Sequence, residues 1–287
     1  MRWQGERESD NVEDRRRMGA PTRGVAIGGG GLLLLLAFAL LTGEDPIRLL
    51  ETVTGPQTSV EQGQAPGEAG APQDQLGRFA SVVLASTEDV WQRQFAGAGK
   101  RYRVPTLVLF SSAVESACGF SSAAVGPFYC PGDSKVYVDL SFFDELQNRF
   151  GAPGDFAQAY VIAHEVGHHV QTLTGVSEQV NNARLRGQNI EGDNGLLVRQ
   201  ELQADCYAGL WAYHAQQKHQ WLEAGDIEEA LNTASAIGDD RLQKQSQGTV
   251  VPDAFTHGTA AQRTRWFKRG FDTGNVEDCD TFAAKSL

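Results

Sequence analysis

The chain has 287 residues, of which 41% are hydrophobic, 21% charged and 9% aromatic, a composition that excludes a wholly disordered chain, a collagen and a coiled coil. Its formal net charge of −11 at pH 7 argues against nucleic acid as a partner, because a polyphosphate would be repelled. The acidity does not restrict a peptide substrate, since the charge that lines a cleft decides that choice.

The first 75 residues are expected to lie outside the folded domain. Residues 1–23 have mixed charge and few large apolar side chains, which predicts a disordered cytoplasmic tail. Residues 24–43 carry no charge and include GLLLLLAFALL, enough apolar length for one transmembrane helix in the lipid bilayer. Basic residues precede this run and Glu44 follows it, which predicts a cytoplasmic N-terminus and an extracytoplasmic domain. Residues 44–75, rich in Gly and Pro, predict a flexible linker.

Other interpretations of residues 24–43 remain open. Ala-Phe-Ala at 37–39 could be the cleavage site of a secretory signal, although the apolar run continues beyond it. The run could also be a buried helix. A cytoplasmic enzyme that is loosely attached to a membrane is a further alternative.

Residues 76–287 are enough for one domain with a substantial core. Apolar residues at helical spacing predict helices, and β-branched and aromatic runs predict strands. Strands are expected within 101–112 and 135–142, and helices over 76–95, 141–150, 155–174, 196–218, 226–237 and 257–271, the last capped by Thr256. Strands early and helices late indicate an α+β domain.

A metal-binding pattern lies on the helix that begins at Asp155. His164 and His168 are one turn apart, so both imidazoles can reach one ion. Glu165 is offset by one position, so it can stand beside the metal and exchange a proton with a water molecule. The pattern predicts a Zn²⁺ site in which Glu165 is catalytic.

A third ligand must come from elsewhere in the chain. Glu201 and Asp205 share one face of the helix 196–218 with several apolar residues, where buried carboxylates need a cation or hydrogen-bond partners. We therefore expect Glu201 to bind the metal and Asp205 to orient a ligand histidine. The alternative is that both are acids on a solvated face.

His257 is predicted to open a helix and to project into a cleft, where it could stabilise the oxyanion of a tetrahedral intermediate. Two alternatives stay open for this residue. It could have no catalytic role, or it could replace Glu201 as the third ligand.

The four cysteines contain no Cys-x-x-Cys pair, which disfavours a cysteine zinc site. In an exported domain, the simplest connectivity joins Cys118 to Cys130 and Cys206 to Cys279. Four free thiols are the alternative.

Four motifs in order resemble those of the bacterial neutral zinc metallopeptidase family, whose members have an N-terminal membrane helix and a zincin-like domain. They are CGFSSAAVGPFYCPGDSKVYVDLSFF, AHEVGHHVQ, ELQADCYAGLWA and HGTAAQRTRWFKRGF. The resemblance implies a zinc-dependent peptidase. A further resemblance to gluzincins carries the ligand role onto Glu201 and the orienting role onto Asp205. Zincins also have an edge strand that pairs with substrate, for which residues 135–140 are the candidate.

The resulting hypothesis is a membrane-anchored zinc peptidase that hydrolyses peptide bonds in a peptide or protein substrate. The rival hypothesis is a membrane-tethered binding or scaffold module without catalysis, whose zinc is structural or vestigial and whose helix-rich C-terminal half recruits a partner. A closed site with both Glu201 and His257 on the metal would favour this hypothesis.

Overall fold

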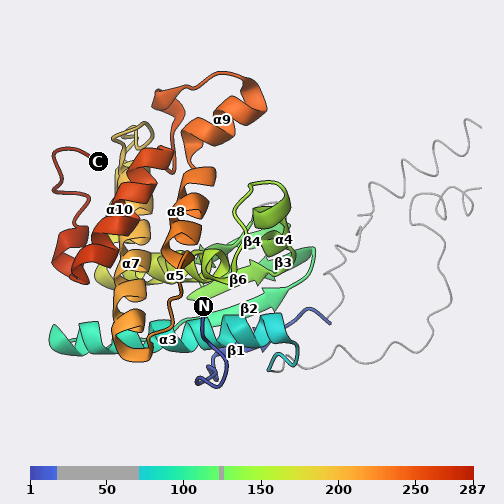
Figure 1. The fold of residues 1–287 in the computed structure, drawn as a ribbon. Helices are drawn as coiled ribbons and strands as arrows, with labels where there is room; N and C mark the ends of the chain where they lie inside the picture. The colour runs from blue at the N-terminus through green and yellow to red at the C-terminus, as the bar shows by residue number, and fades with distance from the viewer. Residues whose placement is uncertain (18–70, 123–125) are drawn as a thin grey trace, which may run out of the picture.

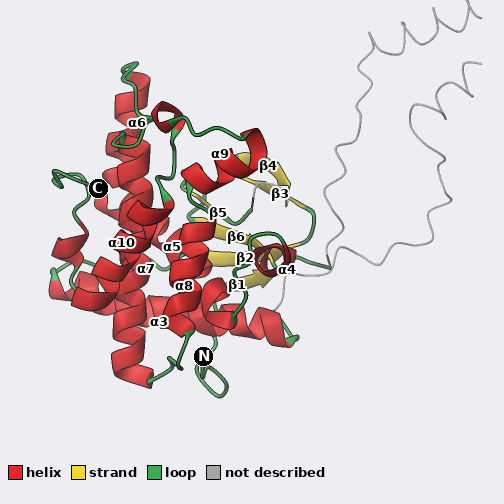
Figure 2. Cartoon of the chain, turned by 45° about the horizontal axis from the view of Figure 1, so that its top comes forward, coloured by secondary structure: helices red, strands yellow, loops and turns green. Residues whose placement is uncertain are grey.

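A small sheet on one side and a stack of helices on the other make up the fold of residues 1–17, 71–122 and 126–287, the part of the chain that the computed structural model describes (Figure 1, Figure 2). In this part of the chain, all six strands precede residue 140, and every helix except α3 (Gln75–Gly97) follows it. The α+β class predicted from the sequence is therefore confirmed.

The main sheet has the strand order β1, β2, β6, β5. Strands β1, β2 and β6 are parallel, whereas β5 is antiparallel to β6, and β3 and β4 form a separate hairpin. The strands are β1 (Val12–Asp14), β2 (Thr106–Phe110), β3 (Ala113–Ser116), β4 (Gly119–Ser122), β5 (Phe128–Cys130) and β6 (Lys135–Asp139). Consecutive residues Leu107, Val108 and Leu109 are all buried, as expected for a strand that is covered on both faces.

The prediction that residues 135–140 form an edge strand is wrong. Strand β6 pairs with β2 on one side and with β5 on the other, so it lies inside the sheet and its backbone groups are already used. The two edges of this sheet are the short strands β1 and β5. Alternation of apolar residues predicts a strand at 135–139 but does not distinguish a central strand from an edge.

The helices pack across one another in the second half of the chain. They are α3 (Gln75–Gly97), α4 (Ser141–Asn148), α5 (Asp155–Thr174), α6 (Val176–Leu185), α7 (Leu196–His219), α8 (Asp226–Ala236), α9 (Asp239–Gln247) and α10 (Ala260–Thr273), with short 3₁₀ turns η2 (Pro252–Ala254) and η3 (Val276–Cys279). Helix α7 runs beside α10 and also packs on α5 (Figure 1). A Cβ at Gly270 of α10 would lie 1.9 Å from the carbonyl oxygen of Cys206, so only glycine allows this close crossing.

The last long helix begins later than predicted. Thr259, not Thr256, is its N-cap: the Thr259 hydroxyl accepts from the Gln262 backbone N–H at 3.1 Å, and the Gln262 side chain accepts from the Thr259 N–H at 2.8 Å. This reciprocal capping box satisfies two backbone donors at once. His257 therefore lies in the loop before α10 and not in its first turn.

Residues 1–17 are part of the folded domain. Strand β1 pairs with β2, and Trp3 packs edge-on against Phe79 of α3 with ring centroids 5.3 Å apart. The buried carboxylate of Glu88, also on α3, accepts hydrogen bonds from Ser9 at 2.5 Å, Asn11 at 2.9 Å and Arg7 at 3.1 Å. The polar side chains of residues 1–17 thus bind a buried polar group on α3. The sequence of this segment alone does not reveal that partner.

This packing corrects the predicted location. The expected transmembrane helix at 24–43, and most of the expected linker at 44–75, lie outside the described residues. Among the described residues, none of the helices combines the length and the apolar character needed to cross a bilayer. Arg16 and Asp74, which flank the stretch 18–70, form a hydrogen-bonded ion pair, so both ends of this stretch emerge at one place on the domain. A single-pass protein with a cytoplasmic tail and an extracytoplasmic domain is therefore wrong.

The contacts of Glu88 give a test of the N-terminal packing. Replacing Glu88 by Ala removes the acceptor of three donors, and we expect the free energy of unfolding to fall by about 2–3 kcal/mol. Asp89→Ala is the matched control: its ion pairs with Arg7 and Lys218 are at the surface, so the loss should be below about 1 kcal/mol. Urea unfolding followed by circular dichroism measures both, and equal losses would contradict the buried role of Glu88.

Candidate metal centre

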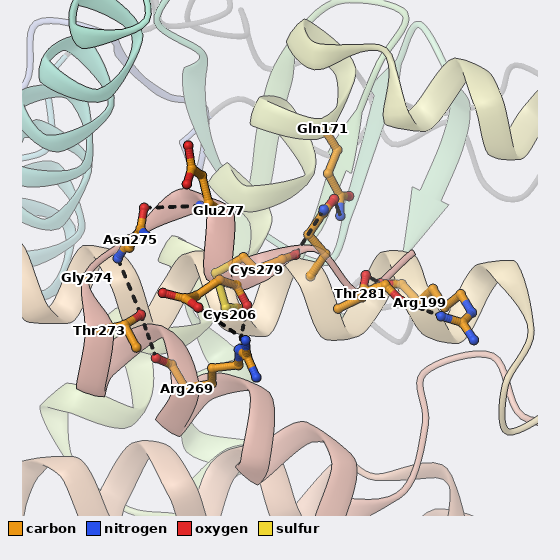
Figure 3. The surroundings of a disulfide bond; sticks show 12 residues. Gln171, Arg199, Cys206, Arg269, Thr273, Gly274, Asn275, Glu277, Cys279 and Thr281 are labelled. Carbon is orange, nitrogen blue, oxygen red and sulfur yellow. Dashed lines mark hydrogen bonds and ion pairs between the residues drawn. A yellow bond between two sulfur atoms is a disulfide. The ribbon is translucent and has the colours of Figure 1, made fainter. Parts of the chain in front are cut away.

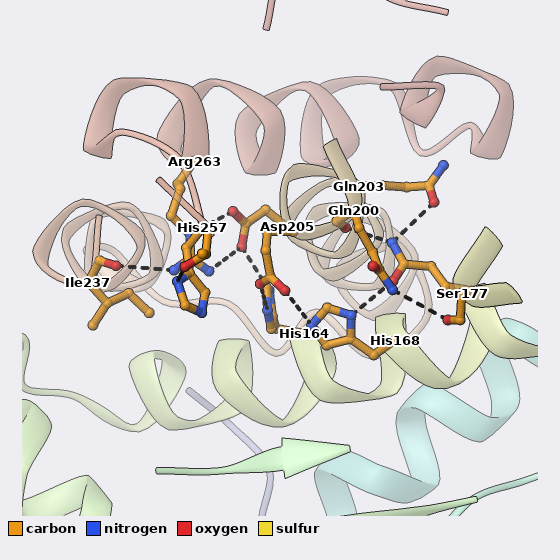
Figure 4. A network of polar contacts seen from close by, with 12 residues as sticks. His164, His168, Ser177, Gln200, Gln203, Asp205, Ile237, His257 and Arg263 are labelled. Carbon is orange, nitrogen blue, oxygen red and sulfur yellow. Dashed lines mark hydrogen bonds and ion pairs between the residues drawn. The ribbon is translucent and has the colours of Figure 1, made fainter. Parts of the chain in front are cut away.

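Three predicted ligands meet between α5 and α7. His164 and His168 lie one turn apart on α5 (Figure 4). Glu201 lies on α7, and one ligand atom of each of the three residues lies within 4.8 Å of the others. Nε2 of His164 is 3.2 Å from Oε2 of Glu201, and Nε2 of His168 is 3.4 Å from Oε1. In a tetrahedral zinc site with ligand distances of about 2.0–2.1 Å, neighbouring ligand atoms are about 3.3 Å apart. The donor set and its spacing therefore fit zinc.

Close packing of the two helices brings these ligands together. A Cβ at Gly167 of α5 would lie 3.1 Å from Cα of Ala204 on α7, too close for a larger side chain without a shift. Gly167 precedes His168, and Ala204 is three residues beyond Glu201, so this contact is beside the ligands. The glycine between the two histidines thus allows Glu201 to reach them.

Asp205 is fully buried and accepts from three different side chains. His164 Nδ1–H donates to it at 2.8 Å, Arg263 Nε and Nη2 donate at 2.9 Å each, and the Tyr160 hydroxyl donates at 2.5 Å. Burial raises the pKa of Asp205, but Arg263 and His164 outweigh burial and hold this pKa well below its ordinary value. Asp205 stays ionised and fixes the proton of His164 on Nδ1, which leaves Nε2 free for a metal.

The negative charges of Asp205 and Glu201 favour a cation at this centre. Burial lowers the pKa of His164, but the carboxylates of Asp205 and Glu201 outweigh burial and raise it to about 10. In the chain without metal, the centre therefore retains a proton near Glu201. A divalent ion can take the place of this proton.

Glu165 stands beside the three ligands on the wall of a cleft of about 910 Å³. Its side chain is 8% exposed, and it forms no hydrogen bond or ion pair with another residue of the described ranges. An unpaired carboxylate at the wall of a cleft is suited to proton transfer.

His257 lines the same cleft but is not among the residues whose ligand atoms converge. The Asp239 carboxylate holds its loop: Oδ2 accepts from the backbone N–H groups of Thr256, His257 and Gly258 at 2.7, 2.6 and 3.1 Å. Oδ1 is 3.2 Å from the Nδ1 atom of His257. Burial lowers the pKa of His257, but Asp239 and the charge of Glu201 outweigh burial and raise it. The half-exposed ring of His257 thus faces the cleft, and its neighbours favour the protonated form.

Two disulfides brace this region. Cys118 is bonded to Cys130 at the end of β5, and Cys206 of α7 is bonded to Cys279 of η3 (Figure 3). These are the pairs expected from the sequence. Cys206 directly follows Asp205, so the second bond ties the C-terminal tail to the helix that carries Glu201 and Asp205.

Sequence reasoning missed the side chains that hold the site in place. Arg263 lies on the apolar stripe of α10 with Trp266, Phe267 and Gly270, which is the same signal that pointed to Glu201 and Asp205. The others are Tyr160, Gln171 and Asp239, for which helix position offers only a partial signal or none.

The chain is similar to a known family and to several proteins of other bacteria. The family described as "Putative neutral zinc metallopeptidase" matches residues 1–282. The chain belongs to this family. Among its relatives, "Uncharacterized protein YpfJ" of Escherichia coli (strain K12) is 51% identical over 288 residues, which cover 98% of this chain and 99% of that protein. "Uncharacterized protein Rv2575" of Mycobacterium tuberculosis is 46% identical over 212 residues, 70% of this chain and 69% of that protein. No solved structure matches the chain.

In this member of the family, His169 gives a prediction about pH. His169 is 1% exposed, its Nε2–H donates to the Arg103 carbonyl at 2.6 Å, and its Nδ1 accepts from the Tyr129 hydroxyl at 3.1 Å. Burial lowers the pKa of His169 to about 4, below the value of about 6.5 expected in the unfolded chain. As pH falls from about 6.5 to 4, only the unfolded chain takes up this proton, so stability should fall by about 3 kcal/mol.

The measurement is the free energy of unfolding against pH, with a chelator present so that metal release does not contribute. His169→Gln cannot take up the proton and should show a shallower loss of stability between pH 6.5 and 4. The same slope in both proteins would contradict the assignment.

Proposed function

We propose that the protein is a zinc-dependent peptidase that hydrolyses peptide bonds, with Glu165 as general base and then general acid. The observation that carries the proposal is the convergence of His164, His168 and Glu201 beside the unpaired carboxylate of Glu165 at a cleft. Three protein ligands leave a fourth position open, which is typical of catalytic sites and not of structural ones. When bound, zinc would make a water molecule more acidic and polarise the scissile carbonyl.

Glu165 would move the protons of the reaction. Its carboxylate accepts a proton from the attacking water as the new C–O bond forms at the carbonyl carbon. The protonated Glu165 then donates this proton to the leaving nitrogen as the C–N bond breaks, and the carboxylate is restored. Its freedom from other partners supports this double role, because no ion pair has to break before the proton moves.

His257 would stabilise the negative charge that develops on the carbonyl oxygen. Its ring lines the cleft, and Asp239 fixes both the ring and the loop that carries it. Asp239 raises the pKa of His257, which favours the protonated ring that can donate a hydrogen bond to an oxyanion.

Strand β5 would bind the substrate backbone. It is the edge of the sheet beside α5, and its residues Phe128 and Tyr129 line the cleft. A free strand edge pairs with an extended peptide through main-chain hydrogen bonds, which places little demand on the side chains of the substrate. An extended or unstructured polypeptide is therefore the expected substrate.

The role of Glu165 is tested by Glu165→Gln. The amide cannot accept the proton, so cleavage of casein or another unstructured protein should fall by about 10²–10⁴-fold while zinc content is unchanged. A chelator should abolish cleavage by the wild-type protein, and added zinc should restore it. If the wild type binds zinc and cleaves nothing, or if Glu165→Gln cleaves as well as the wild type, the proposal is wrong.

The role of His257 is tested by His257→Gln. Loss of a charged donor to the oxyanion should lower kcat by about 10–10³-fold, with a smaller change in KM and no loss of zinc. His219→Gln is the control, because His219 pairs with Glu6 and does not line the cleft. Loss of zinc from His257→Gln would instead indicate that His257 is a ligand.

A further inference from the structure

A chain of buried hydrogen bonds links the second ligand histidine to the C-terminal tail (Figure 3, Figure 4). His168 Nδ1 lies 2.9 Å from Oε1 of Gln171, and Gln171 Nε2 donates to Oε1 of Gln203 at 3.1 Å. Gln203 Nε2 then donates to the carbonyl oxygen of Cys279 at 3.1 Å. Gln171 and Gln203 are 0% and 6% exposed, so water does not compete for these bonds.

The direction of this chain is fixed at its far end. A backbone carbonyl only accepts, so the NH₂ group of Gln203 must face Cys279 and its oxygen must face Gln171. The NH₂ group of Gln171 also donates to the Gln200 carbonyl at 2.7 Å, which leaves only its oxygen for His168. Nδ1 of His168 must therefore carry a proton, and Nε2, which lies 3.4 Å from Oε1 of Glu201, is the ring nitrogen that faces the proposed metal position.

The Cys206–Cys279 disulfide holds the far end of this series of hydrogen bonds, the Cys279 carbonyl. This bond joins η3 to α7 at the residue after Asp205 and so fixes the Cys279 carbonyl relative to the two metal-binding helices. A second clasp lies further along the tail, where Arg199 donates to the Ala284 carbonyl at 3.0 Å and the Thr281 hydroxyl donates to the Arg199 carbonyl at 2.6 Å.

Two buried glutamines are an expensive way to fill a core. A buried amide costs free energy unless its hydrogen bonds are made, and an apolar side chain of the same size would avoid that cost. Here the bonds run in one direction, from the ligand histidine through both glutamines to the Cys279 carbonyl, and one further bond joins Gln171 to the Gln200 carbonyl. On the other ligand, Asp205 serves the same purpose with a charged oxygen.

We propose that Gln171 and Gln203 are positioning residues for the metal centre, and that the Cys206–Cys279 disulfide anchors them. This relay sets the tautomer and orientation of His168, so that reduction of the disulfide weakens metal binding. The inference rests on the proposed metal site but not on catalysis, and it is tested by the affinity for zinc.

The first test replaces each glutamine by Met, which has a similar size but cannot accept or donate these bonds. Zinc affinity, measured on the full chain by competition with a chelator, should fall about 10–100-fold for Gln171→Met and Gln203→Met. Gln200→Met is the matched control on α7, because its side chain bonds Ser177 outside the relay and its carbonyl is kept. Cobalt bound in place of zinc should show a changed absorption spectrum in the two relay variants only.

A rescue variant separates positioning from mere packing. Gln171→Glu still offers an oxygen to His168, so it should bind zinc more tightly than Gln171→Met although it loses the bonds to Gln200 and Gln203. Circular dichroism of the metal-free proteins shows whether each variant folds. If Gln171→Met does not fold, Gln203→Met and Gln171→Glu still decide the question.

The second test removes one disulfide at a time. Cys206→Ala with Cys279→Ala should lower zinc affinity about tenfold, less than Gln171→Met because the Arg199 clasp still holds the tail. Cys118→Ala with Cys130→Ala, which removes the disulfide at β5, should leave zinc affinity unchanged.

The outcomes are distinct. If zinc binds the wild type, is lost from His168→Ala and binds folded Gln171→Met and Gln203→Met as tightly as the wild type, the relay is refuted while the metal site stands. If the glutamine variants bind zinc more weakly but Cys206→Ala with Cys279→Ala binds zinc as tightly as the wild type, the anchoring role of the Cys206–Cys279 disulfide is refuted. Failure of the wild type to bind zinc at all would refute the metal site and the relay together.

Discussion

The buried carboxylate of Asp205 is the interaction on which the rest of the structure depends. It joins α7 to His164 of α5 and to Arg263 of α10, so three helices meet at one ionised group. An ionised group without partners at this depth would cost several kcal/mol, which means that each helix must bring its donor to within hydrogen-bond distance. Close crossings at Gly167 and Gly270 make this geometry attainable. The arrangement that buries one charge therefore also aligns the ligands.

The charges around Asp205 leave a small net negative charge on the groups that face the proposed metal position. Arg263 neutralises Asp205, so among the three proposed ligands Glu201 alone brings a negative charge. The two histidines proposed as ligands are oriented by different acceptors, a carboxylate for His164 and an amide oxygen for His168. A metal bound here would keep most of its positive charge, which is the property that activates water and carbonyl groups.

The sequence predicts the parts of the site that depend on short spacing. The turn between His164 and His168, the stripe that holds Glu201 and Asp205, and the end of α5 at Gly175 all follow from helical periodicity or from glycine. It does not predict what depends on distant partners. Arg263 is 58 residues from Asp205, and residues 1–17 find their partner Glu88 about 80 positions away. The polar composition of residues 1–17 predicts exposure to solvent as long as their buried partner Glu88 is not known.

The helices that carry the metal centre are more tightly packed than α9, which forms part of the cleft wall. The ligands and Asp205 lie on long helices that are packed on several sides and braced by a disulfide. By contrast, α9 lines the cleft with Leu242, Gln245 and Ser246, and from Asp240 to Ser246 none of its side chains is buried. Elements with few buried contacts open at a low cost in free energy, whereas a packed core does not. In the proposed reaction, the steps that need fixed distances would take place on the rigid helices, whereas α9 is the part of the cleft wall that a bound polypeptide could displace at the lowest cost.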